Sequence, residues 1–254
     1  MNRLILIVAL VLLGLLAALL PAFAEQDLAP RSVEIETARG VKLKAMYHAA
    51  QSPNGAAVVI APGQGYHMEL PLITTSAARL ADEGFAVLRF DWAFFTAKGA
   101  PAADFATEVA DLDAAIAWVH ALDGVDKVVV AGKSIGSLVA MKRAGSKHDD
   151  LAGVALLTFP IHNPGAHEQL WVTPDDIDNV GRPMSVFVGD RDPLCDLGTL
   201  YALIAKTKTP APIIVVPGEH SFRDPDNKND KARTAANIDV IVNALVLYCG
   251  RWIE

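Results

Sequence analysis

Six short, unbroken apolar runs constrain the fold of this chain more than any other feature of its sequence. They are AAVVIAP, FAVLRFD, KVVVAG, AGVALLT, MSVFVGD and PIIVVPG. Runs of this length are typical of strands that are buried on both faces of a sheet. Segments with helical periodicity alternate with them, at 70–83, 104–122, 134–146, 196–206 and 229–249. The alternation predicts an α/β protein with a mostly parallel, twisted sheet and helices on both faces.

A different pattern precedes these runs. The segments SVEIET and VKLKAMY alternate apolar and polar residues, and a short Ala38-Arg39-Gly40 connection separates them. Such alternation predicts two strands of an antiparallel hairpin with one face in solvent.

The N-terminus has the order of segments found in secretory signal peptides. One basic residue, Arg3, precedes an apolar run at 4–20, and Ala22-Phe23-Ala24 follows it. We therefore expect residues 1–24 to be a signal peptide that is cleaved after Ala24, and residues 25–254 to form one domain that is exported to the periplasm or secreted. The alternative is an uncleaved helix that anchors the protein, because the run approaches the length that spans a bilayer.

Charge and cysteine content narrow the possible partners. The formal net charge is -7 and no run of Lys or Arg occurs, so the chain lacks the basic surface of nucleic-acid-binding proteins. We expect no nucleic-acid partner, and membrane contact only through the N-terminal segment if it is not cleaved. Cys195 and Cys249 could form a disulfide in an oxidising compartment or remain as two unpaired thiols.

The stretch VVVAGKSIGS, residues 128–137, fits two motifs. A phosphate-binding loop would need a glycine at position 127, which is Lys127, and a flexible loop where Val128 to Val130 read as strand. The alternative is the G-x-S-x-G elbow, in which a buried strand runs into a tight turn that presents a serine at the start of a helix. The sequence meets each requirement of the elbow, so we predict that Ser134 is a nucleophile.

A nucleophilic serine needs a histidine base and a carboxylate, in the chain order Ser, Asp or Glu, His. His220 follows the last apolar run, and Asp190 and Asp192 follow the run before it. We favour Asp192 as the acid, because it lies further into the loop and can turn back toward the histidine. Asp190 is the alternative acid; if Asp192 has that role, Asp190 would stabilise the loop.

The same chemistry needs N–H donors for a developing oxyanion. Ile135, directly after the nucleophile, supplies one, and Gln64 in the loop APGQGYH supplies the second. A dinucleotide-binding fingerprint in this loop would need a third glycine at Met68, so we expect no nucleotide cofactor.

Several blocks of sequence together resemble a known family: APGQGYHMELP, VLRFDWAF, AGKSIGS, LTFPIHNPGAHEQL, GDRDP and GEHSF. With these blocks, the chain from Ala57 onward resembles the α/β-hydrolases, and more narrowly the dienelactone-hydrolase-related group that includes the testis-expressed small hydrolase-like proteins of animals. The resemblance implies the α/β-hydrolase fold and the roles of Ser134, Asp192 and His220 given above. The chain departs from that group at Pro62, where a histidine is common, and at Gln64, where a small residue is common. It also has a serine where dienelactone hydrolases use a cysteine.

Candidate substrate contacts lie in two places. Trp92, Phe94 and Phe95 follow the run FAVLRFD, and they line either an apolar pocket or the core. Residues 159–180 form a modest insertion where hydrolases of this fold carry a cap, and its residues His162, His167, Glu168 and Trp171 are candidates to line a substrate entrance. The two histidines do not have metal-site spacing, so we expect no metal.

Lys133, beside the predicted nucleophile, either occupies a variable position of the elbow or attracts acidic substrates.

Taken together, these patterns predict an exported serine hydrolase that cleaves a small-molecule ester without a cofactor. The same catalytic residues could also cleave thioesters, lactones and amides. The alternative is a binding or scaffold protein that retains the fold without the chemistry.

Overall fold

The computed structural model describes residues 28–146 and 150–254. The predicted signal peptide lies outside the described residues. Eight strands form one sheet in the order β1-β2-β4-β3-β5-β6-β7-β8. The strands are β1 (Arg31–Glu36), β2 (Lys42–His48), β3 (Ala56–Ala61), β4 (Ala86–Phe90), β5 (Lys127–Lys133), β6 (Gly153–Leu157), β7 (Met184–Gly189) and β8 (Ile213–Val216).

The six apolar runs are strands β3 to β8, as predicted, and each pairing between two of these six strands is parallel. The predicted hairpin is also confirmed: β1 and β2 are antiparallel, and β2 joins the sheet by pairing antiparallel with β4. Because β5 lies in the middle of the sheet, its carboxyl end opens at the centre of the edge where ligands bind in folds of this class.

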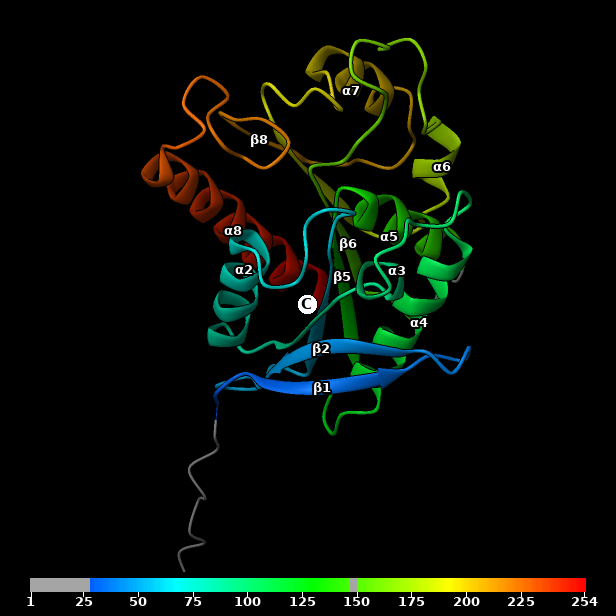
Figure 1. Ribbon diagram of the computed structural model, residues 1–254, viewed down its shortest axis with the longest axis vertical. Coiled ribbons are helices and arrows are strands. Elements are labelled where there is room, and N and C mark those ends of the chain that lie inside the picture. Colours follow the sequence, from blue (N-terminus) through cyan, green and yellow to red (C-terminus); the bar gives the residue numbers. More distant parts are fainter. Residues whose placement is uncertain (1–27, 147–149) are drawn as a thin grey trace, which may run out of the picture.

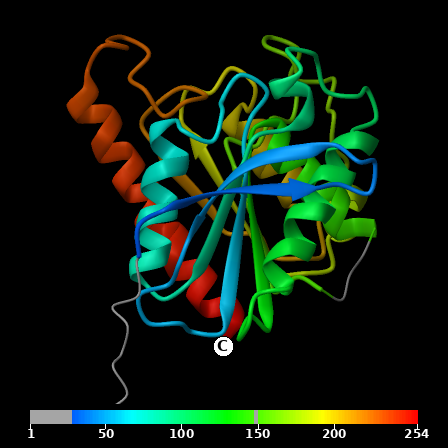
Figure 2. The ribbon, with the colours of Figure 1, turned by 60° about the horizontal axis from the view of Figure 1, so that its bottom comes forward.

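Helices cover both faces of the sheet. The long ones match the predicted helical segments: α2 (Pro71–Asp82), α4 (Ala106–His120), α5 (Ile135–Ser146), α7 (Leu197–Ile204) and α8 (Lys231–Ile253). Figures 1 and 2 show α2 and α8 on one face and α4 and α5 on the other. Two short helices, α3 (Ala93–Thr96) and α6 (Pro174–Asp178), were not predicted, because four or five residues are too few to show a helical period.

Successive side chains along the strands point alternately into two apolar cores, one on each face of the sheet. On β3, for example, Val59 packs in the core beneath α4 and α5, while Val58 and Ile60 pack in the core beneath α2 and α8. The two cysteines lie in different cores, Cys195 in the first and Cys249 in the second, and both are unpaired. The structure therefore favours two buried thiols over a disulfide.

Among the described residues, α8 is the one helix whose length and composition would let it cross a membrane. Its most apolar 18-residue stretch has a mean hydropathy of 1.2. One of its faces is buried against the sheet, and the residues of that face are Ile238, Ile241, Val242, Leu245 and Cys249. This packing is that of a core helix.

Candidate active site

Ser134 lies on a tight turn between β5 and α5. Its φ is +56°, in the left-handed region that costs a residue with a side chain roughly 1–2 kcal/mol. The flanking glycines make the turn possible: a Cβ on Gly132 would lie 2.1 Å from the carbonyl oxygen of Gly136, and a Cβ on Gly136 would lie 2.5 Å from that of Ala61. The strand, the strained turn and the helix have the geometry of a nucleophile elbow.

A hydrogen-bonded chain links the three residues predicted to act together. Ser134 Oγ lies 2.8 Å from His220 Nε2, and His220 Nδ1 lies 2.8 Å from Asp192 Oδ2. The Asp192 side chain is fully buried, whereas that of His220 is 17% exposed. Asp192 Oδ1 also accepts a hydrogen bond from the Leu194 amide at 2.9 Å, which fixes the plane of the carboxylate. With Nδ1–H donated to Asp192, Nε2 is the nitrogen that can accept the serine proton.

In the described part of the chain, the His220 ring is hydrogen-bonded to Asp192 and Ser134 and not to Asp190, the alternative acid. Its Oδ1 accepts a hydrogen bond from the Gly218 amide at 2.8 Å, and so it holds the start of the loop that carries His220. Asn237 on α8 holds the same loop from the other side, because its Nδ2 donates to the carbonyl oxygens of Pro217 and Phe222. Sequence reasoning missed Asn237; the only signal was a polar residue on the buried face of an apolar helix.

The two predicted oxyanion donors lie beside the serine. Ile135 is the first residue of α5, where backbone N–H groups have no acceptor within the helix. Gln64 lies in a turn closed by a bridge between Gly63 and Tyr66, and a Cβ on Gly63 would lie 3.3 Å from Ser134 Cβ. Within the described part of the chain, neither amide donates to another residue. Both can therefore donate to a ligand.

Two of the predicted substrate contacts, Trp92 and His162, are not where a substrate could touch them. Trp92 is fully buried, and its indole N–H donates to the Pro62 carbonyl oxygen at 2.8 Å. His162 is also fully buried: Nε2 accepts from the Asp196 amide at 2.9 Å, and Nδ1 pairs with the Asn163 carbonyl. Both residues support loops at the site, Trp92 the Gln64 loop and His162 the loop after Asp192.

Phe95, another predicted contact, is 36% exposed. Its ring stacks on His67 with 5.7 Å between centroids, and it lines a shallow depression with Gln64 and Asp91. Phe95 is thus exposed beside the Gln64 loop, where a ligand could contact it.

Lys133 has an environment that the sequence did not predict. The side chain is 3% exposed and packs against Gly63, with Nζ 4.8 Å from the centre of the Tyr66 ring. Burial lowers the pKa of Lys133 to about 8, although the negative charges of Asp192 and Glu219 oppose this effect. An ammonium in this position supports the underside of the Gln64 loop and is poorly exposed to acidic substrates.

Among residues 28–146 and 150–254, no group of three His, Cys, Asp or Glu side chains is arranged to hold a metal ion.

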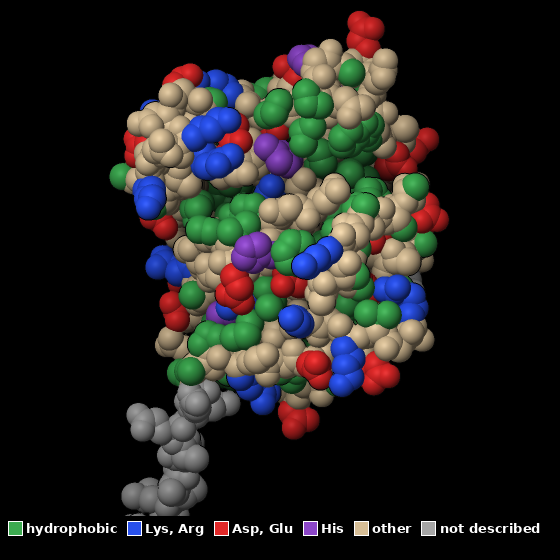
Figure 3. Space-filling model, in the orientation of Figure 1, with side chains coloured by type: hydrophobic (Ala, Val, Ile, Leu, Met, Phe, Trp, Pro, Cys, Tyr) green, Lys and Arg blue, Asp and Glu red, His purple; other side chains and the backbone are tan. Residues whose placement is uncertain are grey.

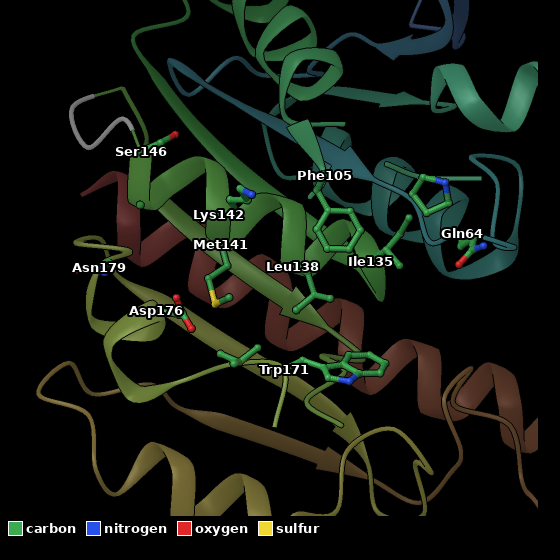
Figure 4. Close-up of a pocket in the computed structure, with 13 residues that line it drawn as sticks. Gln64, Phe105, Ile135, Leu138, Met141, Lys142, Ser146, Trp171, Asp176 and Asn179 are labelled. Atoms are coloured by element: carbon green, nitrogen blue, oxygen red, sulfur yellow. The ribbon is translucent and has the colours of Figure 1, made fainter. Parts of the chain in front are cut away.

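A cavity of about 700 Å³ opens beside the elbow, and both Gln64 and Ile135 line it (Figure 4). The site thus offers a strained serine, a histidine base, a buried carboxylate, two free amides and a space for a ligand.

Sequence comparison identifies the family. Residues 54–248 match the model of the alpha/beta hydrolase domain, which covers most of the chain and all of the site. The chain belongs to the alpha/beta hydrolase family. No curated protein sequence matches it significantly.

Solved structures share the fold of this hydrolase at low sequence identity. The Pf2001 esterase of Pyrococcus furiosus superposes with a TM-score of 0.70 at 19% identity, over 89% of this chain and 94% of that one. XC6422 of Xanthomonas campestris, a serine hydrolase without a lid, gives 0.65 at 19% identity over 88% and 94%. Est1E of Butyrivibrio proteoclasticus gives 0.67 at 18% identity over 87% and 98%. At these identities the similarity establishes the fold.

Proposed function

We propose that this protein is a serine hydrolase that cleaves carboxylic esters through an acyl-enzyme, with Ser134, His220 and Asp192 as its catalytic triad. The observation that carries the proposal is the hydrogen-bonded chain from Ser134 Oγ through both ring nitrogens of His220 to the buried Asp192 carboxylate. A serine elsewhere in a protein rarely combines a strained backbone with an oriented imidazole, and this combination activates a nucleophile.

In the first half of the reaction, Ser134 Oγ attacks the ester carbonyl carbon while His220 Nε2 takes the hydroxyl proton. The negative charge that develops on the carbonyl oxygen is stabilised by the amides of Gln64 and Ile135, and by the N-terminal end of α5. The tetrahedral intermediate then collapses: the bond from carbon to the alcohol oxygen breaks, and His220 gives its proton to the departing alcohol.

In the second half, a water molecule takes the place of the alcohol. His220 removes a proton from that water as it attacks the acyl-enzyme, and returns the proton to Ser134 Oγ when the acid is released. Asp192 stabilises the positive imidazolium at each step and holds the ring in the tautomer that presents Nε2 to the serine. The side chains present are sufficient for this cycle.

Two finer statements belong to the same proposal. The similarity in fold to an esterase favours carboxylic esters over thioesters, lactones and amides. Within the family, we place the chain near the dienelactone-hydrolase-related group, with a serine in place of the cysteine nucleophile and with Pro62 and Gln64 altering the oxyanion loop. The signal-peptide pattern of residues 1–24 supports export of the protein. The proposed partner is a small-molecule ester.

The test is hydrolysis of p-nitrophenyl acetate by the wild type and by Ser134→Ala, with Ser185→Ala as the control. Ser185 is a buried serine on β7 that takes no part in the hydrogen-bonded chain. We expect Ser134→Ala to lose at least about 10⁴-fold in kcat/KM and Ser185→Ala to remain near wild type. Equal loss in both variants, or no hydrolysis by the folded wild type, would favour the binding-protein alternative.

A further inference from the structure

The cavity beside the elbow extends along one face of α5. Its floor includes Leu138, Met141 and Gly145, whose spacing of three and four residues places them on one side of the helix. Figure 4 shows Ile135 and Gln64 at one end and Ser146 at the other. The rise from Ile135 to Ser146 makes the cavity roughly 16 Å long.

The walls of this cavity are mostly apolar and partly open to solvent, and the polar side chains of Lys142, Asp176 and Asn179 lie toward the end distant from Gln64. Phe105 lies on one side, and Trp171 from the 159–180 insertion lies on the other. Val172, from the same insertion, also lines the cavity. Trp171 is 46% exposed, although an indole of this size is normally buried or used in binding. Hydrophobic side chains also gather in the upper half of Figure 3, over the region that Figure 1 shows between α5, α6 and α7. An apolar ligand would cover this surface.

The position of His220 decides which half of an ester would occupy the cavity. The departing alcohol oxygen must lie within reach of His220 Nε2, since that nitrogen returns the proton. The cavity begins at the oxyanion residues Gln64 and Ile135 and continues along α5, and its described lining residues include none of Ser134, His220 and Asp192. The alcohol therefore departs on the His220 side, and the cavity lies on the side of the acyl group.

We infer that this cavity binds the acyl chain of its substrate, and that the protein prefers esters of medium- to long-chain fatty acids. This inference rests on the proposed function. A chain of about twelve carbons would fill the length of the cavity, since each carbon of an extended chain adds somewhat less than a C–C bond of about 1.5 Å.

The test measures kcat/KM of the full-length protein for p-nitrophenyl esters with acyl chains from two to sixteen carbons. Each buried methylene contributes about two- to four-fold. We therefore expect a rise of at least about 100-fold from acetate to a maximum near ten to twelve carbons, then a decline. A second series, acetate esters of alcohols of increasing length, should stay within about threefold.

Variants of residues inside and outside the cavity show whether the cavity causes the preference for long acyl chains. Trp171→Ala removes an exposed wall residue and should lower kcat/KM at least tenfold more for the twelve-carbon ester than for the acetate ester. Tyr201→Ala, which removes an aromatic side chain of similar exposure on α7 outside the cavity, should change neither. Met141→Trp, which fills the middle of the floor, should move the maximum to shorter chains; its folding is checked by circular dichroism.

Acetate hydrolysis that requires Ser134 but does not rise with acyl length would overturn the inference and leave the proposed function intact. The inference would also be overturned, with the proposed function intact, if kcat/KM rose with the length of the alcohol, or if Trp171→Ala and Tyr201→Ala lowered kcat/KM equally. Absence of hydrolysis of every ester by the folded protein would overturn both.

Discussion

Replacing Lys133 by Met should make the protein more stable at neutral pH, although the wild-type residue lies next to the nucleophile. The ammonium is almost fully buried, and its pKa is lowered to about 8 from the ordinary value of 10.5, chiefly by burial. One pKa unit corresponds to about 1.4 kcal/mol, so the buried charge costs the fold roughly 3 kcal/mol. The attraction of Nζ to the Tyr66 ring offsets about 1 kcal/mol of this cost. Met has a similar length and no charge, so we expect a gain of roughly 2 kcal/mol.

The sign of the pH dependence follows from the same values. In the unfolded chain Lys133 stays protonated up to about pH 10.5, whereas in the fold it loses its proton near pH 8. Between these values the unfolded state binds more protons, so the stability of the wild type rises with pH and the penalty disappears. The stability advantage of Lys133→Met should therefore shrink steadily between pH 8 and pH 10.

The assay is urea denaturation of both proteins at pH 7, 8.5 and 10, which gives the free energy of unfolding at each pH. Lys127→Met is the control, because Lys127 lies at the exposed opposite end of the same strand. We expect the free energy of unfolding of that control to differ little from wild type, because the Lys127 side chain is exposed. A Lys133→Met variant that is less stable than wild type at pH 7, or whose advantage is the same at pH 10, would refute the reasoning.

Three further changes have defined outcomes. Asp192→Asn should lower kcat for p-nitrophenyl acetate roughly 10⁴-fold with little change in KM, because the amide favours the wrong histidine tautomer; a loss below tenfold would contradict this. Gly136→Ala should cost about 1–3 kcal/mol of stability and most activity, since its Cβ would lie 2.5 Å from the Ala61 carbonyl, whereas Gly250→Ala meets nothing within 4 Å and should be neutral or stabilising by urea denaturation. Burial and the neighbouring Arg89 lower the pKa of His48 to about 4, so the unfolded state binds more protons between pH 6.5 and 4 and stability falls as pH drops through this range; in thermal unfolding, His48→Gln should lose less stability over that range than wild type.

Most of the sheet could be predicted because strands buried on both faces leave a direct record in the sequence. The runs AAVVIAP and KVVVAG have almost no polar residue, and no other common element of that length requires this. The order of strands was not accessible in the same way. That β2 pairs with β4, which lies 38 residues beyond it from His48 to Ala86, depends on contacts between segments distant in sequence.

The site was predictable where a motif fixes the backbone and unpredictable where packing decides. Ser134 and its two glycines form a local pattern, and the structure brings them together with His220 and Asp192. Trp92 and His162 also follow strands, as binding residues often do. Their polar nitrogens instead find backbone partners in the interior, and one-dimensional spacing does not contain that information.

The burial of Lys133 and the cavity along α5 were missed for the same reason. A lysine in a variable position of the elbow is normally exposed, and only the closeness of the Gly63 loop encloses it. The cavity left a weak trace, since Leu138, Met141 and Gly145 share one face of α5. Apolar residues at this spacing usually indicate core. The opposite wall was predicted in part, because Trp171 of the 159–180 insertion was a candidate to line a substrate entrance.

The central claim is that Ser134 is an activated nucleophile, and labelling with a fluorophosphonate probe tests it most directly. The probe reacts with serines that have an activating base, and mass spectrometry of the digested protein locates the adduct. The account predicts a single adduct on Ser134 in the wild type, none in Ser134→Ala, and much slower labelling in His220→Ala. A folded wild type that takes no label, or labels at another serine, would contradict it.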